Sequence, residues 1–151
     1  MDRETEILDE LYKERDNFLS RVQQELKRAQ RYLSFISFIK IDTTRFNKTG
    51  DIEIPNLNSE TSRRMKTLLR KTIRQTDIIS GFNDGKICIL LVETQKDGAD
   101  IVKNRIQESI KYFLHEMFDS PMNWRVDIRL GSFPDNKSTP NSFYDSIRTS
   151  L

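Results

Sequence analysis

The sequence has few residues whose chemistry is suited to catalysis. Cys88 is its single cysteine and His115 its single histidine. One residue of each type excludes a disulfide framework, a zinc site built on cysteines and a histidine-rich metal site. It also argues against a nucleophile that is activated by histidine. Because Cys88 stands inside an apolar run, we expect its thiol to be buried and unreactive.

A second set of chemically interesting residues comprises Arg74, Asp77 and Arg105. The planar fork of an arginine side chain matches the oxygens of a phosphate group, so these residues suit an anionic ligand. They also have a purely structural explanation. Arg74 can complement the dipole at a helix C-terminus, Asp77 can cap a strand, and Arg105 can be a solvated residue on a polar helix face. The residues alone leave both explanations open.

The elements that would position these residues follow from the spacing of apolar residues, glycines and prolines. Residues 3–31 contain no Gly or Pro and carry apolar residues at spacings of three, four and seven, which predicts one long helix. Arg74 is expected to end a second helix, and Asp77 to begin a strand, so that both side chains point to one exposed surface. The first half of the chain is further expected to contain a strand over 33–42, a polar loop over 43–58 and a helix from Asn58 or Ser59. Strands over 77–82 and 86–92, joined by a hairpin turn at 83–85, should follow. The chain should then continue with a helix over 97–118, a strand over 124–130 and a short helix from Asn141.

The N-terminal helix is more polar than the rest of the chain. We therefore divide the chain into a helical extension, 1–31, and a domain, 32–151. The helix can pack on a protein partner, on a second copy of the chain, or on its own domain.

Length and charge narrow the class of protein. A chain of 151 residues fits one domain with an appendage. With 25 basic and 23 acidic residues the net charge is +2, which argues against a nucleic-acid-binding domain. No apolar run approaches the roughly 18 residues of a membrane span, and no signal peptide is evident, so we expect no membrane partner and a cytoplasmic location.

The element order and several strings resemble the GGDEF domain, the diguanylate cyclase module of bacterial second-messenger signalling. The resemblance covers residues 25–150 and implies an α/β (α+β) fold, in which a mostly antiparallel central sheet is flanked by helices. It rests on Glu25–Tyr32, which is similar to the family's E-x-x-R-A-x-R-Y, on the strand ending at Asp42, on Phe46, on Arg74–Asp77 as the family's R-x-x-D, and on the strands 87–94 and 126–131.

The sequence departs from the family at the positions that the resemblance assigns to catalysis. The signature Gly-Gly-Asp/Glu-Glu-Phe falls on Asn83-Asp84-Gly85-Lys86-Ile87, so a glycine and a lysine replace two acidic residues. Of the metal-binding aspartates only Asp42 remains, and its companion is Thr44. The family's substrate asparagine falls on Gly50, its guanine-reading aspartate on Ser59, and its Gly-His pair on Ile54-Pro55. We therefore expect a degenerate domain that is not an enzyme and has no catalytic residues, no cofactor and no metal site.

The resemblance further implies that the R-x-x-D residues can bind the product, cyclic di-GMP. In the family the arginine grips phosphate and guanine, the aspartate accepts from guanine N1 and N2, and a second arginine completes the site. These roles fall on Arg74, Asp77 and Arg105. The expected function is an inactive signalling module that binds cyclic di-GMP. The alternative is a protein-interaction scaffold with no nucleotide ligand, whose partner or second copy is bound through the N-terminal helix.

Overall fold

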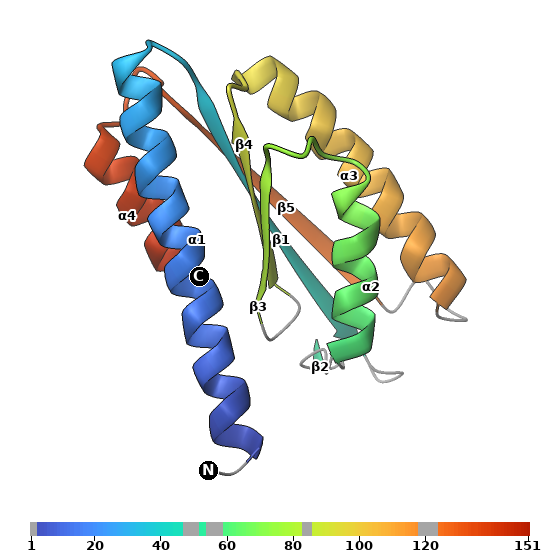
Figure 1. The fold of residues 1–151 in the computed structure, drawn as a ribbon. Coiled ribbons are helices and arrows are strands. Elements are labelled where there is room, and N and C mark those ends of the chain that lie inside the picture. Colours follow the sequence, from blue (N-terminus) through green and yellow to red (C-terminus); the bar gives the residue numbers. More distant parts are fainter. Residues whose placement is uncertain (1–2, 47–51, 54–58, 83–85, 118–123) are drawn as a thin grey trace.

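A computed structural model describes residues 3–46, 52–53, 59–82, 86–117 and 124–151 (Figure 1). No helix in these ranges combines the length and the apolar character that a membrane crossing requires. The elements are α1 (Arg3–Arg31), β1 (Ile36–Phe46), β2 (Ile52–Glu53), α2 (Ser59–Arg70), β3 (Ile78–Phe82), β4 (Lys86–Val92), α3 (Lys96–Met117), β5 (Trp124–Phe133) and α4 (Pro140–Ser150).

All strand pairings are antiparallel, and β1 lies at the centre of the sheet. β4 pairs with one edge of β1 and β5 with the other, while β3 pairs with the far side of β4. The two residues of β2 pair only with the end of β1. The expected class, a mostly antiparallel sheet flanked by helices, is therefore confirmed.

The helices cover both faces of this sheet (Figure 1). One core cluster joins α1 and α4 to β1, β4 and β5, and a second joins α2 and α3 to the opposite face of β1 and β4. Their separation follows from the alternation of side chains along a strand. On β1, Ile36 and Phe38 belong to the first cluster, whereas Ile39 and Ile41 belong to the second.

The second half of α1 is part of the first core cluster. Its buried side chains are Phe18, Leu19, Val22, Leu26 and Ala29. Packing on the chain's own domain is thus the arrangement seen for this half. The spacing of apolar residues also includes Ile7, Leu8 and Leu11 in the first half of α1. Their side chains are not among those that the structure describes.

The start of β1 differs from the predicted strand over 33–42. α1 closes with hydrogen bonds from the Tyr32 amide to the Arg28 carbonyl and from the Ser34 amide to the Ala29 carbonyl. That closure requires a residue with positive φ, a role usually taken by glycine, and here Leu33 adopts it with φ of 53°. Leu33 is consequently a helix-ending residue, and the strand begins three residues later.

β1 also continues through 43–46, where a polar loop was predicted. β5 pairs with β1 from Ile36 opposite Phe133 to Arg45 opposite Trp124, and so supports the first three residues of this extension, while Phe46 pairs with Ile52 of β2. The β-branched residues Thr43 and Thr44 suit this extended backbone. β5 itself runs past the predicted end at residue 130 to Phe133, which pairs with Ile36 of β1 and packs on Phe143 of α4 at a ring separation of 5.7 Å.

Candidate functional site

The segment between α2 and β3 carries two of the three predicted site residues. α2 ends at Arg70, four residues before Arg74, so the expectation that Arg74 ends the helix is wrong. Its last turn tightens through hydrogen bonds from the Lys71 and Thr72 amides to carbonyls three residues back. Arg74 therefore lies in a turn, which a hydrogen bond from the Asp77 amide to the Arg74 carbonyl closes at 3.0 Å.

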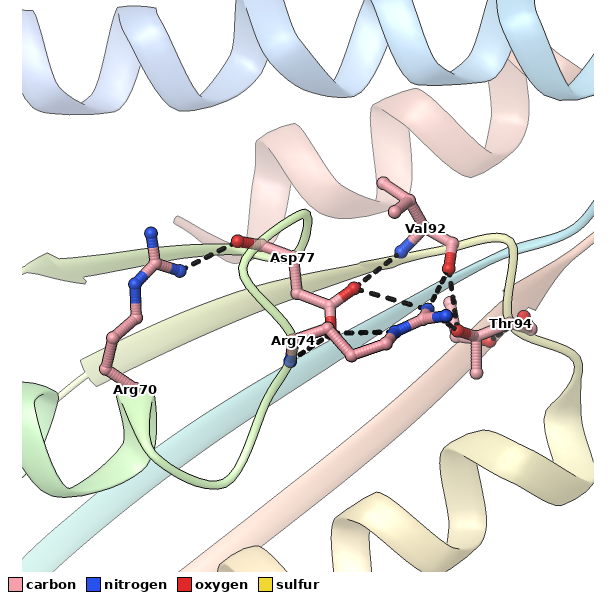
Figure 2. A network of polar contacts seen from close by, with 6 residues as sticks. Arg70, Arg74, Asp77, Val92 and Thr94 are labelled. Carbon is pink, nitrogen blue, oxygen red and sulfur yellow. Dashed lines mark hydrogen bonds and ion pairs between the residues drawn. The ribbon is translucent and has the colours of Figure 1, made fainter.

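Asp77 is the centre of the polar network in Figure 2. Its side chain is only 2% exposed, although the prediction had it facing solvent with Arg74. Oδ2 accepts from the Arg74 amide at 2.9 Å, and Oδ1 accepts from the Val92 amide at 3.1 Å. The carboxylate thus ties the α2–β3 turn to the end of β4.

The Arg74 guanidinium lies over the same carboxylate. Nε and Nη2 each stand 3.5 Å from an Asp77 oxygen. Nη2 also donates to the Val92 carbonyl and, at 2.7 Å, to Thr94 Oγ1. We call Arg74, Asp77, Val92 and Thr94 the Asp77 latch. Because the Arg74 side chain remains 55% exposed, part of the guanidinium still faces solvent.

Sequence reasoning missed two members of this latch. Val92 contributes only backbone groups, which no sequence pattern marks. Thr94 follows the end of β4 and was a findable signal, because a hydroxyl just beyond a strand often bonds to nearby backbone. Its Oγ1 donates to the Val92 carbonyl at 2.8 Å. Arg70 joins from α2, where Nη1 donates to the Asp77 carbonyl at 2.7 Å.

Arg105, the third predicted residue, lies on an exposed face of α3. Among the described residues it forms no hydrogen bond or ion pair with Arg74 or Asp77. The structure therefore brings Arg74 and Asp77 into direct contact, whereas Arg105 is an exposed cation on α3.

Asp42, the remaining candidate metal ligand, lies between two neighbouring strands. Its register partner on β5 is Asp127, whose carboxylate forms an ion pair with Arg129 at 3.8 Å. Lys40 Nζ is 3.7 Å from Asp42 Oδ2, and Lys86 of β4 pairs directly with Asp42. Cys88 stands opposite Lys40 on the same face. We call Lys40, Asp42, Lys86 and Cys88 the Lys40 cluster.

Cys88 supplies the thiol of this cluster. Burial raises the pKa of its thiol from 9.0 to about 12, and this outweighs the lowering by Lys40 and Lys86. The thiol therefore stays protonated and unreactive near neutral pH.

Within the described ranges, no three acidic, histidine or cysteine side chains gather closely enough to hold a metal ion. The predicted hairpin turn, Asn83-Asp84-Gly85, lies outside those ranges. The strands on either side of it pair from Ile78 opposite Leu90 to Phe82 opposite Lys86.

Comparison with solved structures finds the same fold in several proteins. A diguanylate cyclase protein from Thermotoga maritima is 16% identical, with a TM-score of 0.63 over 87% of this chain and 89% of that one. The active GGEEF domain of a Vibrio cholerae diguanylate cyclase is 14% identical, with a TM-score of 0.65 over 89% and 87%. Diguanylate cyclase SiaD of Pseudomonas aeruginosa, solved with its activator SiaC, is 14% identical, with a TM-score of 0.59 over 90% and 53%.

At these identities the structural likeness establishes the fold alone. A comparison with curated protein sequences gave no significant match. The family follows from the sequence profile described as "Diguanylate cyclase, GGDEF domain", which matches residues 8–151 and so includes most of α1. This chain belongs to the GGDEF domain family.

Proposed function

We propose that this GGDEF domain has no cyclase activity and serves as a binding module in a bacterial cytoplasmic signalling pathway. The observation that carries the proposal is the ion pair between Lys40 and Asp42, at 3.7 Å. Asp42 is the last of the expected metal-binding aspartates, and its carboxylate already has Lys40 as an ion-pair partner.

The surrounding charges strengthen this argument. Phosphoryl transfer with two Mg²⁺ ions needs several oxygen ligands that converge on the metals. Lys86, the register partner of Asp42 on β4, adds a second cation beside it, and Asp127, its register partner on β5, is held in an ion pair with Arg129 at 3.8 Å. The substitution of Gly85 for an acidic residue removes another ligand from the sequence.

A titration with Mn²⁺, followed by NMR, tests the missing metal site. Mn²⁺ broadens the signals of nearby nuclei, so a bound ion would erase the amide signals around Asp42 and Lys86. We expect no broadening that is centred on these residues. Saturable broadening there, lost in Asp42→Asn, would contradict the proposal.

The proposed ligand is cyclic di-GMP, bound at Arg74 with Asp77 and Arg105 as the further site residues. The partial exposure of the Arg74 guanidinium supports this, since a phosphate oxygen can reach it. Arg105 adds an exposed cation on α3.

Isothermal titration calorimetry with cyclic di-GMP tests this ligand. We expect saturable binding to the wild-type protein, lost in Arg74→Ala and weakened in Arg105→Ala. Arg148→Ala is the matched control, because Arg148 on α4 is 52% exposed and forms an ion pair with Asp145 three residues earlier. Equal affinity in Arg74→Ala and Arg148→Ala would show that the site is wrongly assigned.

The alternative function is a protein-interaction scaffold without a nucleotide ligand. It is favoured by two large apolar side chains on the exposed face of α3, Ile101 at 56% and Tyr112 at 67% exposure. SiaD, which shares the fold, was solved with an activator protein. Binding of a partner that Ile101→Lys abolishes, with no heat from cyclic di-GMP, would support the scaffold.

A further inference from the structure

We propose that Asp77 is a positioning residue for Arg74 and not a ligand contact, so that the site accepts a phosphodiester without selecting its bases. The identity of the ligand as a cyclic dinucleotide rests on the proposed function. The role of Asp77 rests on the contacts of the Asp77 latch alone.

The hydrogen-bond acceptor positions of the Asp77 carboxylate are all occupied within the protein. Two carboxylate oxygens offer about four acceptor positions. Two are taken by the amides of Arg74 and Val92, and two by Arg74 Nε and Nη2. Because the side chain is also almost wholly buried, the donor edge of a guanine has no free acceptor to reach.

The same contacts fix the orientation of the Arg74 side chain. The edge of the guanidinium that carries Nε and Nη2 faces Asp77, and Nη2 is further held by the Val92 carbonyl and Thr94 Oγ1 (Figure 2). Thr94 is itself fixed, because its amide donates to the Phe35 carbonyl at 3.1 Å. Among the described residues, Nη1 has no hydrogen-bond partner.

A single available nitrogen, Arg74 Nη1, limits which ligand groups the site can recognise. Selective reading of guanine uses two donors placed together on O6 and N7. Nη1 alone can satisfy one oxygen, and the most accessible oxygens of a cyclic dinucleotide are those of its phosphates. The latch therefore predicts binding through phosphate that is nearly indifferent to the base.

Two titrations, one with cyclic di-GMP and one with cyclic di-AMP, test the selectivity. We expect the two dissociation constants to agree within about threefold, whereas a guanine-reading pair would give about tenfold or more. Asp77→Asn should weaken both ligands by the same factor. A guanine preference above tenfold that Asp77→Asn removes would overturn the inference.

A second measurement tests the positioning role without any ligand. The NMR signal of an arginine Nε–Hε group reports how firmly the side chain is held. We expect the Arg74 signal to be rigid in the wild-type protein and as mobile as that of Arg105 in Asp77→Ala. If Arg74 is already as mobile as Arg105 in the wild-type protein, the inference is wrong.

The two measurements separate this inference from the proposed function. If neither cyclic dinucleotide binds, the proposed ligand is refuted, and the NMR comparison alone supports or overturns the positioning role. If both bind equally and Arg74 is rigid only when Asp77 is present, both proposals are supported.

Discussion

Removal of the Asp77 carboxylate should destabilise the domain far more than removal of an exposed carboxylate. In Asp77→Ala the amide of Val92 loses its acceptor at the buried end of β4. A buried donor left without a partner costs about 1–3 kcal/mol. The Arg74 amide lies in a part-buried turn, where a water molecule can replace the carboxylate as acceptor. The loss of this hydrogen bond therefore costs about 0.5–1.5 kcal/mol.

The ion pair with Arg74 contributes less than these backbone contacts. Its arginine is half exposed, and such pairs are worth about 0–1 kcal/mol. We therefore expect the free energy of unfolding to fall by about 1.5–5.5 kcal/mol. For a domain of this size that loss corresponds to a decrease in melting temperature of about 3–20 °C.

Urea denaturation followed by circular dichroism measures this loss. Asp127→Ala is the matched control, because Asp127 of β5 is half exposed and its ion pair with Arg129 spans 3.8 Å. The control should cost less than about 1 kcal/mol. A loss for Asp77→Ala within about 0.5 kcal/mol of the control would refute the view that the latch holds the turn to β4.

Three further predictions address other parts of the fold. Leu26→Ala should cost about 2–5 kcal/mol in urea denaturation, because Leu26 of α1 is buried in the core; a cost below about 1 kcal/mol would show that α1 is a loose appendage. Lys66→Met should lower the free energy of unfolding by about 0.5–1 kcal/mol, since Lys66 Nζ donates to Glu14 at 2.9 Å and joins α2 to α1; a loss no larger than that in the exposed control Lys111→Met would contradict this contact. Cys88 should resist a thiol reagent at pH 8 in the folded protein and react in urea, because the pKa of its thiol is raised to about 12; rapid labelling of the folded protein would contradict its burial. The pKa of this thiol is 9.0 in the unfolded chain and about 12 in the folded protein, so Cys88 does not lower the free energy of unfolding below pH 9.0. Between pH 9.0 and about 12 the thiol ionises in the unfolded chain first, which lowers the free energy of unfolding as the pH rises. Cys88→Ala should therefore lose less stability over that range than the wild-type protein.

Helices and most strands were predictable because their signals are local. The absence of Gly and Pro in residues 3–31 predicted α1 with the bounds that the structure has. The start of β1 was not predictable, because Leu33 takes a backbone conformation that its side chain does not favour, and only the closure of α1 requires it. The continuation of β1 depends on β5, which lies some 80 residues later in the sequence.

The sequence could predict that Arg74 and Asp77 lie close together, but not which groups surround them or that Asp77 is buried. The spacing of Arg74 and Asp77 already places them in one turn. The burial of Asp77 depends on the Val92 amide, which comes to it through the pairing of β3 with β4. In the same way Lys40 stands two residues before Asp42 in the sequence, but its ion pair follows from a strand in which alternate residues share a face.

The most direct test of the account is an incubation of the purified chain with GTP and Mg²⁺, and separately with Mn²⁺. Mass spectrometry then detects pyrophosphate release, linear dinucleotide and cyclic di-GMP, with an active GGDEF domain as positive control. We predict no product above the protein-free blank, because Lys40 pairs with Asp42 and no three candidate metal ligands gather within the described residues. Metal-dependent formation of cyclic di-GMP that Asp42→Asn abolishes would contradict it.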